Sequence, residues 1–126
     1  MRKLLALLFL TITLGMAQGA HAGPFEDGQA AWGRGDYATA LSLFRPLAAQ
    51  GNASAQYGLG VMYKNGQGVV QDYVRAQMWF NLSASNGYPN ASKNRADVAT
   101  KMTSAQIAQA QELAQRCQAS NYKNCD

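Results

Sequence analysis

At the centre of the chain stands GVMYKNGQGVVQDYVRAQMWF, residues 60–80, in which a glycine-rich segment separates two runs with helical spacing. A phosphate-binding loop would need Gly-x-x-x-x-Gly-Lys-Ser/Thr, or a glycine fingerprint after a strand. Gly66-Gln67-Gly68 instead follows a helical run, and no Lys-Ser/Thr pair comes after it. We therefore predict a turn between two helices, in which Gly66 ends the first helix in a left-handed conformation and Gly68 forms a second turn. Val69 then enters the core, and Asp72 caps the next helix.

The same pattern occurs 36 residues earlier in the chain. Asp36-Tyr37-x-x-Ala40-x-x-x-Phe44 aligns without a gap on Asp72-Tyr73-x-x-Ala76-x-x-x-Phe80. The identities continue through alanines and glycines, with Ala48, Gly51 and Ala55 aligned on Ala84, Gly87 and Ala91. A period between 20 and 50 residues indicates stacked supersecondary units.

Each unit is predicted to contain two short helices. Apolar residues at helical spacing predict helices over 37–50 and 73–86, followed by helices over about 53–65 and 90–101. Pro46 inside the first run predicts a kink or a shorter helix. Gly58 and Gly60 indicate close helix packing, since glycine disfavours a helix interior. A capping box at Thr103-Ser104-Ala105-Gln106 begins a last helix that ends near residue 119.

These residues are specific enough to suggest a family. The motif is Ala55-x-x-x-Leu59-Gly60-x-x-Tyr63-x-x-Gly66-x-Gly68-Val69-x-x-Asp72-Tyr73-x-x-Ala76-x-x-Trp79-x-x-x-x-Ala84-x-x-Gly87. It resembles a nearly complete Sel-one-like repeat, which is related to the tetratricopeptide repeat (TPR). The segment from Asn94-Arg95-x-Asp97 to Leu113-Ala114 is similar to the helix pair that closes many short secreted bacterial members. The resemblance covers about residues 25–120.

The resemblance implies an all-α fold, an α/α superhelix (solenoid) of about three helix pairs whose concave face binds other proteins. The matched positions are packing residues rather than catalytic groups, so the resemblance implies a non-enzymatic protein without a cofactor. The helices over 53–65 and 90–101, each the first of its pair in the repeat of this family, should line the concave face. We therefore expect the partner-binding residues at exposed, non-motif positions of these helices: Gln56, Tyr57, Val61, Lys64, Ser92, Lys93, Asp97 and Thr100.

The N-terminus has the pattern of a secretory signal peptide. Arg2 and Lys3 precede an apolar run over residues 4–16, and Ala20-His21-Ala22 forms a small-x-small cleavage site. We predict a signal peptide over 1–22, a mature domain over 23–126 and a periplasmic or secreted protein. The apolar run is shorter than the roughly 20 residues that span a bilayer. An uncleaved N-terminal anchor is the alternative.

Charge and residue inventory exclude several classes of function. Loss of Arg2 and Lys3 would leave nine basic against seven acidic residues and no basic run, so neither nucleic acid nor an anionic membrane is an expected partner. His21 is the one histidine, and its removal excludes a Ser-His-Asp relay and a histidine-bound metal. Glu26-Asp27 is the one close acidic pair. Adjacent helical residues point apart, so it is a poor acid–base couple.

Cys117 and Cys125 are the two cysteines, and in an exported chain a disulfide is the expected state. A continuous helix would hold them too far apart, so the last helix must end near residues 120–121 and the tail must fold back. The spacing also resembles the cysteine-rich subgroup of the family. A redox or metal role is the weaker alternative, because neither C-x-x-C nor a third ligand is present.

Six aromatic residues could be imagined as a ligand-stacking box, but their regular spacing favours the repeat core for most of them: Trp32, Tyr37, Tyr63, Tyr73, Trp79 and Phe80. The sequence thus favours a module that binds a protein partner, and a sharper version is an inhibitor or immunity-type protein for a periplasmic or secreted enzyme. A structural or regulatory accessory of a cell-envelope assembly is the alternative, and an enzyme ranks third. Three units are near the minimum for a stable stack, so an uncapped end could also form a weak homodimer.

Overall fold

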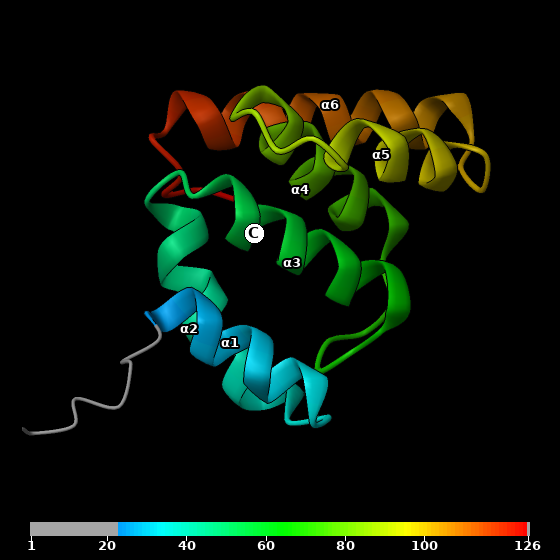
Figure 1. The fold of residues 1–126 in the computed structure, drawn as a ribbon. Coiled ribbons are helices and arrows are strands. Elements are labelled where there is room, and N and C mark those ends of the chain that lie inside the picture. Colours follow the sequence, from blue (N-terminus) through cyan, green and yellow to red (C-terminus); the bar gives the residue numbers. More distant parts are fainter. Residues whose placement is uncertain (1–22, 126) are drawn as a thin grey trace, which may run out of the picture.

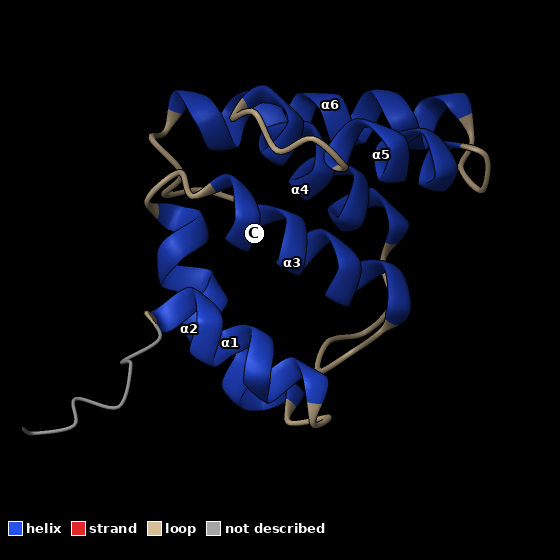
Figure 2. Ribbon diagram, viewed as in Figure 1, coloured by secondary structure: helices blue, strands red, loops and turns tan. Residues whose placement is uncertain are grey.

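The computed structural model describes residues 23–125, and this part of the chain forms six helices and no strand. The helices are α1 (Pro24–Gly33), α2 (Tyr37–Ala49), α3 (Ala53–Asn65), α4 (Tyr73–Ser85), α5 (Ala91–Ala99) and α6 (Ser104–Ala119), shown in Figure 1. Figure 2 shows that loops alone connect them. The all-α prediction is confirmed. The predicted signal peptide, its cleavage site and His21 lie outside the described residues.

Equivalent aspartates begin the second helix of both clear repeats. The Asp36 carboxylate accepts from the Thr39 backbone N–H at 3.3 Å, and the Asp72 carboxylate accepts from the Arg75 N–H at 3.0 Å. The Thr39 hydroxyl also donates to Asp36 at 2.7 Å, and this bond is the main reason that the pKa of Asp36 is lowered. Such caps satisfy backbone donors that the first helical turn leaves free. The 36-residue repeat in the sequence therefore places equivalent N-caps at the starts of α2 and α4.

The glycine-rich segment is the predicted turn between α3 and α4. Gly66 has φ 66° and ψ 42°, the left-handed conformation that ends α3, and Gly68 has φ 73°. Val69 is half-buried against the core, whereas the Val70 side chain is 88% exposed. The predicted roles of Gly66, Gly68, Val69 and Asp72 are confirmed.

Pro46 does not shorten its helix, so that part of the prediction is wrong. Helix α2 continues through Pro46 to Ala49. Proline lacks the N–H that would bond the carbonyl of Ser42, four residues earlier. Both residues lie on the exposed side of α2, where water can reach that carbonyl.

Each helix packs against its predecessor along the first four: α1 against α2, α2 against α3 and α3 against α4. Both α5 and α6 then pack against α4. The core between these layers includes the fully buried side chains of Leu59, Met62, Met78, Phe80 and Leu82. The stack leaves the first helices of the two clear repeats, α1 and α3, near each other (Figure 1).

Most of the six aromatic residues belong to the core, as predicted. Tyr63, Trp79 and Phe80 are buried, and Tyr37 and Tyr73 are half-buried against the same cluster. Trp32 is the exception, with 39% of its surface exposed.

The C-terminal segment, residues 121–125, folds back on the stack. Helix α6 ends at Ala119, and a disulfide joins Cys117 to Cys125. The Tyr122 ring lies against the α2–α3 turn, where a Cβ added to Gly51 would be 3.2 Å from it. The Tyr122 hydroxyl exchanges hydrogen bonds of 3.0 and 3.3 Å with the Asn86 side chain. Figure 1 shows this segment in red, close to that turn.

Candidate functional site

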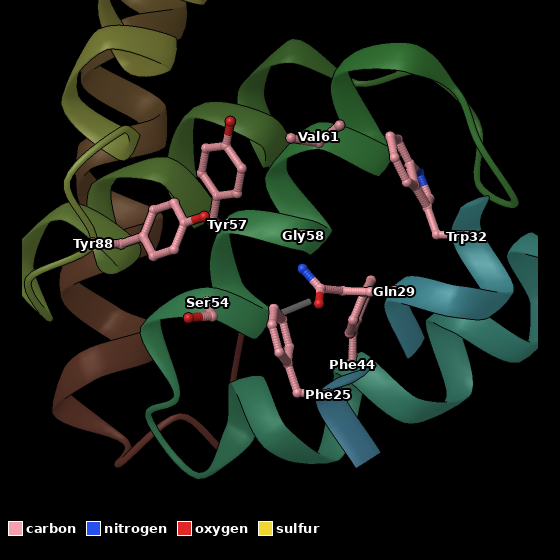
Figure 3. Close-up of a pocket in the computed structure, with 9 residues that line it drawn as sticks. All are labelled: Phe25, Gln29, Trp32, Phe44, Ser54, Tyr57, Gly58, Val61 and Tyr88. Carbon is pink, nitrogen blue, oxygen red and sulfur yellow. The ribbon is translucent and has the colours of Figure 1, made fainter. Parts of the chain in front are cut away.

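A hollow of about 110 Å³ opens between α1 and α3, and we call it the α1–α3 groove. Its lining is mostly aromatic and comes from the first helices of both repeats, with one residue each from α2 and the α4–α5 turn: Phe25, Gln29, Trp32, Phe44, Ser54, Tyr57, Gly58, Val61 and Tyr88. Figure 3 shows Tyr57 and Tyr88 together at one side of the groove and Trp32 at the other.

Phe44 lies between α1 and α3, close to two glycines. A Cβ added to Gly28 would be 2.6 Å from Phe44 Cε1, and one added to Gly58 would be 3.0 Å from Cε2, on the opposite edge of the ring. Phe25 packs against the same ring, with 5.6 Å between ring centroids. The two glycines therefore allow both helices to approach Phe44 closely, and the base of the groove is a tightly packed aromatic layer.

Two tyrosines form the wall on one side. The Tyr57 and Tyr88 rings are stacked, with centroids 4.5 Å apart, and the Tyr57 ring also contacts Phe80. The Asn94 side chain donates a hydrogen bond of 3.0 Å to the Tyr57 hydroxyl. Burial, followed by the neighbouring Tyr88 phenol, raises the pKa of Tyr57. Tyr57 is therefore a neutral phenol with a fixed ring.

Trp32 forms the opposite wall, and the glycine-rich loop positions it. The indole Nε1–H donates to Gln67 Oε1 at 2.9 Å, and Gln67 Nε2 donates to the Tyr37 hydroxyl at 3.3 Å. Since the polar atom of the indole already has a partner, the exposed part of Trp32 offers an apolar surface.

Two of the predicted binding residues meet in the groove. Tyr57 and Val61, one turn apart on α3, both line it. Lys64 lies half-buried farther along α3 and does not line the groove. The other four predicted residues, three on α5 and Thr100 directly after it, are exposed but likewise outside the groove: Ser92, Lys93, Asp97 and Thr100.

Gln56 was expected to be exposed, and that expectation is wrong. Its side chain is fully buried. Its Nε2 donates to the Ala48 carbonyl at 3.2 Å, and its Oε1 accepts from Asn86 Nδ2 at 2.9 Å. Gln56 thus connects α2, α3 and the end of α4. Successive residues of an α-helix differ in direction by about 100°, so Gln56 faces the core although its neighbour Tyr57 lines the groove.

Sequence reasoning missed the contribution of α1. Phe25, Gln29 and Trp32 are on the first helix of the first repeat, and the argument that selected α3 and α5 applies equally to α1. The 36-residue alignment begins at Asp36, after the end of α1, so it gave no signal for this helix. Tyr88, in the turn after α4, carried no recognisable signal.

The chemistry of the groove is that of a contact surface. Its ionisable groups are the phenols of Tyr57 and Tyr88. Glu26 and Asp27 are exposed in the first turn of α1. Within residues 23–125, no three His, Cys, Asp or Glu side chains gather where they could hold a metal ion. Nor is any helix in this range both long and apolar enough to span a membrane.

Comparison with known proteins agrees with the fold. The Sel1 repeat model matches residues 22–52, which contain α1 and α2, and residues 53–88, which contain α3 and α4. A search of curated proteins gave no match. Sel1 repeats form TPR-like α solenoids that generally act as non-catalytic modules for protein–protein interaction. Because the two repeats together cover more than half of the sequence, the chain belongs to the Sel1 repeat family.

Proposed function

We propose that this protein is an exported, non-enzymatic module that binds a protein partner on the concave face of its superhelix, with the α1–α3 groove at the centre of the contact. The observation that carries the proposal is the aromatic lining of the groove, in which Trp32 stays exposed while its polar atom is already bonded. Aromatic residues are enriched at binding hot spots, and Trp and Tyr contribute most there.

The size of the groove favours a side chain of a larger partner. A volume of about 110 Å³ is small beside the roughly 300–1,000 Å³ of pockets that enclose whole small molecules. The walls are also held in place before binding, by the Tyr57–Tyr88 stack and the Trp32–Gln67 hydrogen bond. Preorganisation reduces the entropy lost on binding. One apolar side chain of the partner is the occupant that we propose.

Polar residues beside the groove would extend the contact. Lys64 on α3 and four exposed residues on or directly after α5 retain their proposed role as a polar rim: Ser92, Lys93, Asp97 and Thr100. Charges in such a rim favour the orientation of the partner and the association rate. Asn94, which bonds Tyr57, connects α5 to the wall of the groove.

A matched pair of valine substitutions tests the groove. Val61→Lys places a cation on its lining, and Val70→Lys makes the same change at an 88% exposed loop position outside it. Affinity purification from the source organism should recover one protein with the wild type and Val70→Lys but not with Val61→Lys. Equal recovery with both variants would contradict a groove-centred contact. Circular dichroism of both variants serves as the control for folding.

Export is part of the proposal, and the Cys117–Cys125 disulfide supports it because disulfides persist in oxidising compartments. N-terminal sequencing of protein from the periplasm or the medium should begin at Gly23. A cytoplasmic protein that retains residues 1–22 would contradict export.

Inhibition of a periplasmic or secreted enzyme is the specific form of this function that we propose. It predicts that the recovered partner is a soluble enzyme and that stoichiometric addition of the protein blocks its activity. Recovery with membrane or cell-wall components would favour a structural or regulatory accessory of an envelope assembly. Self-association through an end of the stack stays a prediction, which analytical ultracentrifugation tests.

A further inference from the structure

A second hollow, of about 260 Å³, lies where α5 and α6 both pack against α4, and we call it the α4–α6 cleft. Buried Leu82 and Ala114 lie at its base. The other lining side chains are polar and come from all three helices: Asn81, Ser85, Arg95, Gln111, Gln115 and Gln118. The described linings of this cleft and of the α1–α3 groove share no residue, so the cleft is independent of the proposed function.

Arg95 supplies the charge of the cleft. Among the described residues it is the only charged one in the lining, where no Asp or Glu occurs. The side chain is half-buried and forms no ion pair within residues 23–125. A guanidinium has several N–H donors and no acceptor, and it matches the planar geometry of a carboxylate. The cleft therefore favours a ligand with a carboxylate.

Asn81 holds the guanidinium at the cleft. Arg95 Nη1 donates to Asn81 Oδ1 at 3.4 Å, and this is its hydrogen bond within the described part of the chain. Asn81 Nδ2 is enclosed, so a ligand in the cleft does not reach it. Asn81 is thus a positioning residue, and the other N–H groups of Arg95 are left for a ligand.

A row of three glutamines faces the cleft from α6. Gln111, Gln115 and Gln118 are spaced by four and three residues, which places them on one side of the helix. All three are exposed, and their side chains form no hydrogen bond with another described residue. A side-chain amide has one carbonyl acceptor and an NH₂ donor, the same groups as a peptide bond. Such a row is therefore suited to bonding the main chain of a polypeptide.

The spacing of the row favours an extended chain. Residues four apart on a helix are separated by about 6 Å along its axis. Peptide groups on the same side of an extended chain recur every two residues, or about 6.6 Å. Gln111 and Gln115 can therefore each bond one such group of the same segment. A helix would be a poor ligand for this row, because its main-chain groups already bond one another.

We propose that the α4–α6 cleft binds an extended, acidic segment of a polypeptide. An Asp or Glu carboxylate of that segment accepts from Arg95, while Gln111 and Gln115 bond its peptide groups. The Ser85 hydroxyl, exposed at the end of α4, adds a donor on the other side of the cleft. Recognition through the main chain makes the carboxylate the main sequence requirement.

Two matched peptides test this chemistry by nuclear magnetic resonance of the intact protein. Acetyl-Ala-Ala-Asp-Ala-Ala-amide should shift the side-chain amide signals of Gln111 and Gln115 in a saturable way, and Gln→Ala variants assign these signals. The same peptide with Asn in place of Asp should bind about two- to fivefold more weakly, the range of exposed ion pairs. Acetate, which has a carboxylate but no peptide group, should leave the glutamine signals in place.

Variants separate the charge from the main-chain contacts. Arg95→Gln should abolish the preference for the Asp peptide, whereas Arg45→Gln, an equal change at an exposed position of α2, should keep it. The double variant Gln111→Ala and Gln115→Ala should weaken binding of both peptides by about fivefold or more, because two hydrogen bonds are lost. Gln109→Ala, an exposed position of α6 outside the cleft, should leave the affinity unchanged.

Four results would overturn the proposal. These are no saturable shift up to about 20 mM of the Asp peptide, well above millimolar dissociation constants, or equal affinity of the wild type for both peptides. The third is unchanged affinity in the double glutamine variant. The fourth is a stronger response to glucuronate, an acidic sugar, which would assign the cleft to another class of ligand.

The preference for the Asp peptide is a ratio measured on one protein, so a change in stability alone does not alter it. Circular dichroism of each variant serves as the control for folding.

Discussion

Replacing Gly60 with alanine should destabilise the protein, although alanine is the better helix former. Gly60 lies inside α3, facing α4. A Cβ built there would be 2.6 Å from Phe80 Cδ1 and Cε1 and 3.0 Å from Cζ. Phe80 is fully buried, so its ring has no open space into which it could move.

Two opposing terms set the size of the effect. Alanine gains about 0.5–1 kcal/mol over glycine in a helix interior. Forcing an extra methyl into a packed core costs about 1–3 kcal/mol. Because the added Cβ would lie only 2.6 Å from two ring atoms, the cost belongs to the upper part of that range, about 2–3 kcal/mol, and the net loss should be about 1–2.5 kcal/mol. Each kcal/mol lowers the Tm of a domain of this size by about 4–8 °C.

Urea denaturation followed by circular dichroism measures this change. Gly33→Ala is the control, because Gly33 is also helical but a Cβ added there meets nothing within 4 Å. This control should be as stable as the wild type or slightly more stable. Gly60→Ala should lower the free energy of unfolding by less in a Phe80→Leu background than in the wild type. Wild-type stability in Gly60→Ala, or the same cost in both backgrounds, would refute the argument.

Three further predictions concern the helix end, the disulfide and the groove. Thr103→Ala should lower the free energy of unfolding by about 1 kcal/mol, because it removes the capping box of α6, and Ser104→Ala should change it little in the same urea assay. Reduction of the Cys117–Cys125 disulfide should lower it by about 2–3 kcal/mol in urea titrations with and without reductant; no change would contradict its role. Burial raises the pKa of Tyr57 above 10.0, so the stabilisation from its neutral phenol is complete below pH 10 and is lost as the pH rises through the raised value. Absorbance titration should show a late phase that Tyr57→Phe lacks.

The helix boundaries were predictable because local residues determine them. Asp36, Asp72 and Thr103 cap helices through bonds to backbone three residues away, and Gly66 ends α3 with its own left-handed conformation. Such interactions are readable from spacing alone. The helix order then follows from the repeat.

The binding face was predictable only in part, because burial depends on neighbours distant in sequence. Tyr57 and Val61 line the groove as expected, but Gln56 is covered by α2 and the end of α4. Trp32 joins the groove through Gln67, which is 35 residues away. A periodic pattern identifies a helix face, but it does not show which part of that face another repeat covers.

The helical glycines connect the repeat pattern to the groove. Gly28 and Gly58 contact Phe44, and Gly60 contacts Phe80, which occupies the equivalent position one repeat later. Each repeat therefore has a phenylalanine on its second helix, and a neighbouring helix can pack closely against that ring only where it has a glycine. Around Phe80 the contact is fully enclosed by the core, whereas around Phe44 it lies at the start of the stack, where no earlier repeat in the described residues covers it. The groove is thus the place where a packing contact of the solenoid meets the surface, and a partner side chain bound there would occupy the position that another repeat fills elsewhere in the stack.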